Sequence, residues 1–207
     1  MPDIKIKRLK NTAQIEFTEK KSLFIGYAIS VSSEEEAQAI IKQKKKEYAD
    51  ATHNVYAYMI GDSIARYSDD DEPQGTAGMP TLNSIRMSGI SDVLVVVTRY
   101  FGGILLGAGG LVRAYSTAAS MALEEGGITV YENYSVFEIK CPYSDYGKLS
   151  TELTLYDAII DNTEFADEVT LKFAIKNDIA SKFTENITDI FAGRLNLISK
   201  GTRIDSK

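Results

Sequence analysis

A run of acidic residues is the first part of the sequence whose side chains could do chemistry. Segment 68–80 contains four acids in succession, Asp69, Asp70, Asp71 and Glu72. Carboxylate oxygens bind hard cations, so Asp69, Asp70 and Glu72 would suit Mg²⁺ that also holds phosphate oxygens. A solvated turn that caps the next element is the alternative, because runs of like charge usually face water. Apart from this Mg²⁺, the sequence points to no cofactor.

A glycine-rich loop in segment 97–115 is the second such part, and it joins an apolar stretch to a helical pattern. Glycine lets backbone N–H groups approach a ligand closely and adopts positive φ angles without strain. The first N–H groups of a helix are unpaired and lie in a positive field, so we expect an anion here. Two arginines would add charge-assisted hydrogen bonds of about 1.5–3 kcal/mol each. The expected anion-binding or nucleic-acid-binding residues are Arg99, Gly102, Gly103, Gly107, Gly109, Gly110 and Arg113.

The glycine spacing matches no nucleotide-binding fingerprint. It lacks the Gly-Lys-Ser/Thr ending of a P-loop and the spacing of the dinucleotide motif. Tight packing of a strand against a helix, with glycines as spacers, is therefore an alternative to anion binding. The single histidine, His53, would need a partner within hydrogen-bond reach to act as an acid or base. A structural role is the commoner one for a lone histidine, and the sequence assigns no catalytic residue.

Composition excludes several classes of protein. One histidine and one cysteine rule out a multi-histidine or multi-cysteine metal centre and an internal disulfide. The longest apolar run, residues 93–97, is far shorter than the roughly 18 residues that span a membrane. The first residues lack a secretory pattern, so we expect the cytoplasm. The net charge of −6 argues against strong nonspecific binding to nucleic acid, which depends on lysine and arginine.

The elements that must position these residues follow from hydrophobic periodicity, and they differ between the two halves. Twelve of the 15 glycines lie at or before Gly127, so special backbone geometry belongs to the first half. There the patterns predict strands at 14–20, 23–31 and 54–60, a helix capped by Ser32 or Ser33, a polar loop at 68–79, a short helix at 80–88, a strand at 93–97 buried on both faces, and a helix from Leu111 to Gly126.

The second half predicts strand, helix, two strands, helix and strand. The strands are expected at 130–141, 158–165, 168–176 and 195–199. The first helix follows Pro142 with Ser144 or Asp145 as its cap, and the second follows Asn177 and stops at Gly193. This βαββαβ order is typical of ferredoxin-like domains. The chain therefore predicts an α/β or α+β protein of two domains, residues 1–127 and 131–207.

Three ordered segments resemble the IMPACT/YigZ family. They are Ala51-Thr52-His53-Asn54, the acidic segment 68–80 and the glycine-rich segment 97–115. The resemblance covers about residues 20–127, and the βαββαβ tail fits the second domain of bacterial members. It marks a motif loop formed by His53, Asp69, Asp70, Glu72, Gly75, Thr76 and Gly78.

The resemblance implies a fold and a biological setting. The first domain is expected to be similar to the second domain of a ribosomal small-subunit protein and to RNase PH-type folds. The tail is expected to be similar to the last domain of elongation factor G. Eukaryotic relatives regulate translation by competing for an activator of an initiation-factor kinase, through an additional N-terminal domain. Nucleic-acid or ribosome binding is usually suggested for bacterial members.

The sequence departs from the family pattern at two positions. Asp71 stands where glycine is usual, although aspartate tolerates a left-handed conformation better than most residues. Its charge disfavours direct approach of phosphate. Leu105 stands where many bacterial members have lysine, so the expected anion site has one cation fewer.

Two functions and one structural interpretation follow from these motifs. The first function is a cytoplasmic, non-enzymatic regulator that binds RNA, the ribosome or a translation factor through the glycine-rich loop. The second is a metal-assisted hydrolase or a binder of a small phosphorylated ligand, with Asp69, Asp70 and Glu72 on Mg²⁺ and His53 as base. In the third interpretation both motifs only shape a rigid turn.

Overall fold

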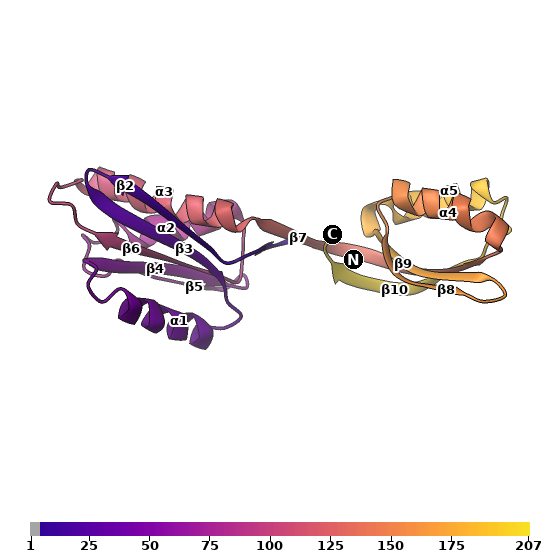
Figure 1. Cartoon of the computed structure of the whole chain (residues 1–207), viewed down its shortest axis with the longest axis horizontal. Coiled ribbons are helices and arrows are strands. Elements are labelled where there is room, and N and C mark those ends of the chain that lie inside the picture. The colour runs from indigo at the N-terminus through magenta and orange to yellow at the C-terminus, as the bar shows by residue number, and fades with distance from the viewer. Residues whose placement is uncertain (1–4) are drawn as a thin grey trace. The chain divides into compact units, whose positions relative to one another are not determined.

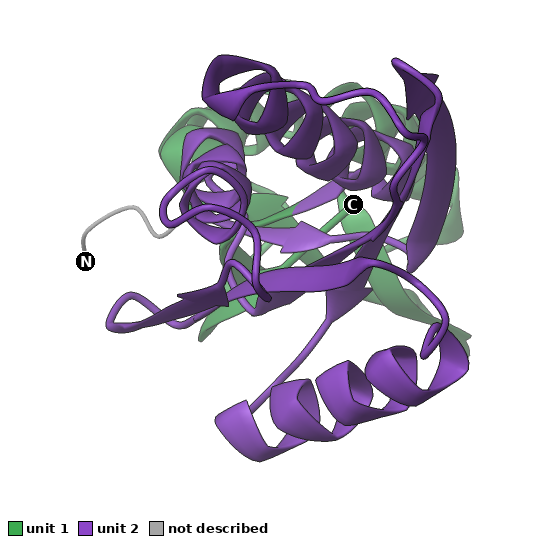
Figure 2. Ribbon diagram, turned by 90° about the vertical axis from the view of Figure 1, so that its left-hand side faces the viewer, with its two compact units in different colours: residues 1–5, 130–207 green, residues 6–129 purple. Residues whose placement is uncertain are grey.

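The computed structural model describes residues 5–207 and divides them into two compact units. One unit consists of residues 6–129, and the other consists of Lys5 with residues 130–207 (Figure 2). Each unit contains one β-sheet, and the strand pairs within both sheets are antiparallel. The fold class is therefore α+β. No helix within residues 5–207 is long and apolar enough to cross a membrane.

The sheet of residues 6–129 has the strand order β2-β3-β6-β4-β5. Its strands are β2 (Ala13–Glu19), β3 (Ser22–Ser30), β6 (Val93–Tyr100), β4 (His53–Ile60) and β5 (Ile64–Ser68). β1 (Lys5–Leu9) lies outside this sheet, and it has a parallel bridge from Lys7 to Ile90. Strands β1 and β5 have no counterpart among the expected elements, because their sequences are too polar for a clear period of two.

The central strand β6 is buried on both faces, as its unbroken apolar run predicts. Val93, Val95 and Val97 pack with α2 (Gly78–Ser88) and α3 (Ala108–Gly126). The alternate residues Leu94 and Val96 pack with α1 (Glu34–Glu47), which covers the opposite face (Figure 1). The core therefore has three layers, and the polar residues at the end of β6 lie at one edge of it.

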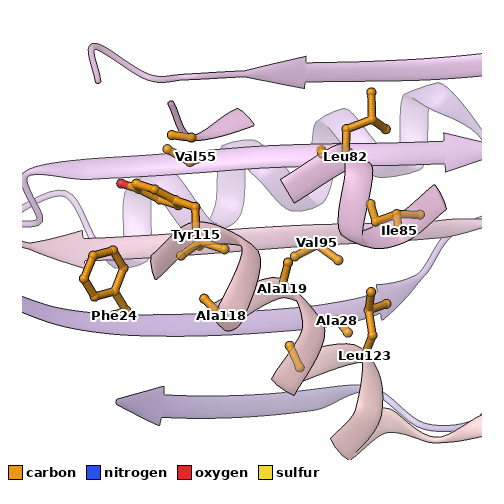
Figure 3. Packing of buried hydrophobic residues seen from close by; sticks show 14 of the residues in the cluster. Phe24, Ala28, Val55, Leu82, Ile85, Val95, Tyr115, Ala118, Ala119 and Leu123 are labelled. Carbon is orange, nitrogen blue, oxygen red and sulfur yellow. The ribbon is translucent and has the colours of Figure 1, made fainter. Parts of the chain in front are cut away.

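Small residues let α3 lie close to the sheet. Ala118 and Ala119 lie over the sheet in the same buried cluster as Ala28 of β3, and larger side chains from α2 belong to this cluster too (Figure 3). A Cβ on Gly26 would lie 2.8 Å from the carbonyl oxygen of Ala118, so β3 has no room for a side chain there. The N-terminus of α3 is thereby fixed relative to the end of β6.

Helix α1 begins as its sequence predicts. The Ser33 side chain accepts a hydrogen bond from the Glu36 N–H, and the Glu36 carboxylate accepts one from the Ser32 N–H. This reciprocal pair satisfies two free N–H groups of the first turn. Lys44, Lys45 and Lys46 lie in the last turn.

The second unit has the expected βαββαβ order. Its elements are β7 (Ile128–Cys141), α4 (Tyr143–Leu155), β8 (Ile159–Phe165), β9 (Val169–Lys176), α5 (Asn177–Ile190) and β10 (Leu197–Asp205). The sheet order is β10-β7-β9-β8, with β1 as a fifth strand beside β7. One cluster of aromatic and aliphatic side chains between the sheet and both helices forms the core.

Two details of this unit differ from the sequence-based expectation. Neither Ser144 nor Asp145 caps α4; the cap position is Pro142, and the Asp145 carboxylate accepts a hydrogen bond from Arg194 instead. β10 continues to Asp205, because a register shift between Ser199 and Gly201 lets the strand resume after the apolar stretch ends.

Candidate functional site

The glycines of segment 97–115 have different physical roles. A Cβ on Gly102 would lie 2.0 Å from the backbone carbon and oxygen of Lys21, so this glycine permits a close approach of two chain segments. Gly103 and Gly107 have φ angles of +82° and +72° with open space beside them. They give the loop a backbone path that other residues adopt only with strain.

The N-terminus of α3 carries free hydrogen-bond donors. The Leu111 N–H donates to the Gly107 carbonyl as the first bond of the helix, and no side chain caps the preceding turn. Within residues 5–207, the N–H groups of Ala108, Gly109 and Gly110 have no acceptor. Ala108 and Gly109 are exposed. These donors lie at the positive end of a 19-residue helix, which is the arrangement that favours an anion.

Arg113 is the arginine that belongs to this terminus. It is exposed and makes no hydrogen bond or ion pair with residues 5–207. It follows Gly110 by three positions and Gly109 by four, so all three share one face of α3. Helical side chains lean toward the N-terminus, so the Arg113 guanidinium can reach over the two glycines.

Arg99, the other arginine expected to bind the anion, is already paired inside the protein. Its side chain is buried, its Nη1 lies 2.6 Å from Glu72 Oε1, and its Nη2 donates to Ser22 Oγ at 3.2 Å. Its Nε is buried without a partner in the described part of the chain. The Arg99 guanidinium is therefore held by Glu72 and Ser22, with its Nε as the remaining donor.

Glu72 is the centre of this buried network. Its Oε1 also accepts a hydrogen bond from the Tyr115 hydroxyl at 2.7 Å. Burial and the Glu72 charge raise the pKa of Tyr115, so the hydroxyl remains protonated and keeps donating. One carboxylate therefore joins the motif loop to β6, through Arg99, and to α3, through Tyr115.

His53 lies beside this carboxylate in a defined tautomer. Its Nδ1 lies 2.7 Å from the Asp70 carbonyl oxygen, and a carbonyl only accepts, so Nδ1 carries the proton. The other nitrogen, Nε2, is 3.7 Å from Glu72 Oε1. His53 also pairs directly with Arg99 across strands β4 and β6. His53 therefore lies between the Asp70 backbone and the Glu72 carboxylate.

The carboxylates of Asp69 and Asp70 contact other parts of the protein than the Glu72 carboxylate does. Asp69 accepts hydrogen bonds from the N–H groups of Gly75, Ala77 and Gly78, and thereby fixes the start of α2. Asp70 accepts from the Asn54 N–H and pairs with Lys45.

The motif loop therefore has the geometry of a structured turn. Asp69, Asp70 and Glu72 each have different partners, and within residues 5–207 no group of three or more His, Cys, Asp or Glu side chains is placed to hold a metal ion. Thr76 donates to the Pro73 carbonyl, Gly75 has a φ angle of +78°, and a Cβ on Gly78 would lie 2.7 Å from the Ser68 carbonyl. The turn interpretation accounts for these residues.

A cavity of about 390 Å³ joins the buried network to the start of α3. It is lined by Thr52, His53, Asp71, Glu72, Pro73, Arg99, Phe101, Leu105, Leu106, Gly107, Ala108 and Leu111. The acidic and glycine-rich segments, which are separate in the sequence, thus share one site. Tyr115, whose helical spacing predicts only a core residue, and Ser22, which lies between two expected strands, also belong to the network; nothing in their spacing indicates these contacts.

Comparison with known proteins places this site in a family. Residues 20–123 match the model of the Impact N-terminal domain, and residues 139–194 match a domain of unknown function. The IMPACT family member YvyE of Bacillus subtilis is 36% identical over 90% of this chain and 87% of its own. The IMPACT family member YigZ of Escherichia coli is 32% identical over 87% of this chain and 90% of its own.

Eukaryotic relatives match about half of this chain. Protein IMPACT of Mus musculus is 29% identical over 54% of this chain and 36% of its own length. A crystal structure described as a hypothetical protein is 30% identical and covers 94% of this chain and 96% of that chain, with a TM-score of 0.59. Since the first-unit model includes the entire cavity lining and the bacterial relatives match nearly end to end, the chain belongs to the IMPACT family.

Proposed function

We propose that this protein is a cytoplasmic regulator that acts in translation by binding the phosphate groups of RNA, free or in the ribosome. The free N–H groups of Ala108, Gly109 and Gly110 at the start of α3 carry this proposal. The choice of translation comes from the family's resemblance to domains of a ribosomal protein, of RNase PH and of elongation factor G. A translation factor with an acidic surface is the competing partner, and failure of the protein to bind RNA at low salt would favour it.

The overall charge limits how many phosphates the site neutralises. With a net charge of −6, the protein has little long-range attraction for RNA, so affinity must come from a few close contacts. One helix terminus and one arginine suit one or two phosphates. We therefore expect the logarithm of affinity to fall with the logarithm of salt with a slope between about −0.7 and −1.4 on single strands.

Arg113→Ala should weaken the binding of a single-stranded oligoribonucleotide about tenfold to 100-fold, because one charge-assisted phosphate contact of about 1.5–3 kcal/mol is lost. The exposed side chain has no partner within residues 5–207, so the melting temperature should not change. Fluorescence anisotropy over a salt series measures both the affinity and the slope. Arg86→Ala is the matched control, since Arg86 is also exposed on a helix of this unit but lies in the last turn of α2. Equal losses in both variants would contradict the site.

Asp71→Asn should strengthen the same binding. Asp71 lines the cavity and has a φ angle of +66°, which asparagine also tolerates. The substitution removes one negative charge near the phosphate, and the gain is about twofold to fourfold at low salt, fading as salt screens the charge. Asp62→Asn, an exposed acid in the β4–β5 turn, is the control. Unchanged affinity of Asp71→Asn at low salt would argue against phosphate near this residue.

A binder of a small phosphorylated ligand is the second candidate, and the cavity beside α3 favours it. A volume of about 390 Å³ is within the range of small-molecule sites, roughly 300–1,000 Å³. The two candidates use the same helix terminus, so they differ in what occupies the cavity rather than in where the phosphate binds.

A further inference from the structure

We propose that the cavity holds the base of one nucleotide, with guanine preferred, while the phosphate of that nucleotide binds the start of α3. This inference rests on the proposed function and identifies the part of the ligand that the helix terminus does not explain. The cavity is lined at one end by Gly107 and Ala108 and elsewhere by His53 and Glu72. A single ligand can therefore reach the free N–H donors and the buried network together.

The side chains that line the rest of the cavity form surfaces that suit a flat ring. Phe101 lines the cavity and is 45% exposed, so one side of its ring is available for stacking. The Arg99 guanidinium carbon lies 5.5 Å from the ring centroid and supports the ring from the protein. Leu105, Leu106 and Leu111 supply the remaining apolar surface. Aromatic stacking of this kind is the usual way that proteins bind unpaired bases.

The polar end of the cavity presents acceptors. The Glu72 side chain is 3% exposed, and its Oε1 takes the hydrogen bonds from Arg99 and Tyr115. Within the described chain, Glu72 Oε2 has no hydrogen-bond partner. A ligand that fills this end must bring N–H donors.

Guanine meets this requirement best among the RNA bases. Its Watson–Crick edge has two adjacent donors, the N1–H and the 2-amino group, which can face the Glu72 carboxylate, whereas adenine and cytosine place an unprotonated ring nitrogen beside their amino group. Uracil has a single N–H between two carbonyl oxygens, and these oxygens would be repelled by the Glu72 carboxylate. A site whose buried acceptors need donors discriminates strongly against a ligand that lacks them.

Titration of the full chain with mononucleotides tests the assignment. By calorimetry, GMP should bind about tenfold tighter than UMP and about tenfold tighter than inorganic phosphate, and it should displace a bound oligoribonucleotide. Phe101→Ala should weaken GMP about tenfold through lost stacking while phosphate affinity stays the same. Ile104→Ala is the control, because Ile104 is similarly exposed on the same loop but does not line the cavity. Circular dichroism of each variant checks that it is folded.

The outcomes separate this inference from the proposed function. If RNA binds in an Arg113-dependent way but GMP binds no tighter than UMP or phosphate, the base site is wrong and the phosphate site stands. If GMP binds selectively but RNA does not, the base site stands and RNA is not the partner. If neither binds, both proposals fail. Should Phe101→Ala not fold, the GMP and UMP affinities of the unaltered chain still decide the base preference.

Discussion

Replacing Gly102 with alanine should destabilise the first unit by at least about 3 kcal/mol, because the added Cβ has no space. It would lie 2.0 Å from the carbon and oxygen of the Lys21 backbone and 2.5 Å from the Ser22 nitrogen. These are backbone atoms at the start of β3, which pairs with β6 along its length, so they cannot move as a flexible side chain would. Urea unfolding followed by circular dichroism measures the loss.

Gly109→Ala is the matched control for this effect. No atom lies within 4 Å of the position that its Cβ would occupy, and its φ angle is not positive. Alanine in a helix is favoured over glycine by up to about 1 kcal/mol, so this variant should be as stable as the unaltered chain or more stable. Similar stability of the Gly102 and Gly109 variants would contradict the close approach.

Arg99→Met should cost about 3–5 kcal/mol of unfolding free energy, since it leaves the Glu72 carboxylate buried without its cation. The pair is enclosed on both sides, with Arg99 5% and Glu72 3% exposed in their side chains. The same unfolding experiment measures the effect.

The double variant Arg99→Met/Glu72→Leu should recover much of this loss, because no buried charge remains. It leaves the Tyr115 hydroxyl without its acceptor, which costs about 1–3 kcal/mol, so adding Tyr115→Phe should recover more. Additive losses in the single and double variants would show that the Glu72–Arg99 contact is not a coupled pair.

The sequence predicts the regular elements well wherever a period repeats. The unbroken run of β6, the cap of α1 and the βαββαβ order each depend on neighbouring residues, and each is confirmed. β5 was not anticipated because its residues Ile64–Ser68 are stabilised by pairing with β4 rather than by their own pattern. Local propensity is weak evidence for such an edge strand.

The sequence predicts most residues of the candidate site, but it does not predict which side chains they contact. The free N–H groups of α3 follow from the glycines and the helix start, and Asp71 adopts the left-handed conformation that aspartate tolerates better than most residues. The pairing of Arg99 with Glu72 was not foreseen, since it joins positions 27 residues apart. Long-range pairing depends on the whole sheet, and the charge of Arg99 alone does not indicate its partner.

Glu72 joins the motif loop to β6 and α3, and this affects both the rate at which a ligand binds and the entropy that is lost on binding. Loops that bind ligands often become ordered only on contact, and this ordering subtracts from affinity. Here the loop is already held by hydrogen bonds to two neighbouring elements. An incoming molecule therefore meets a preformed receptor, and its capture is limited by encounter and orientation rather than by rearrangement.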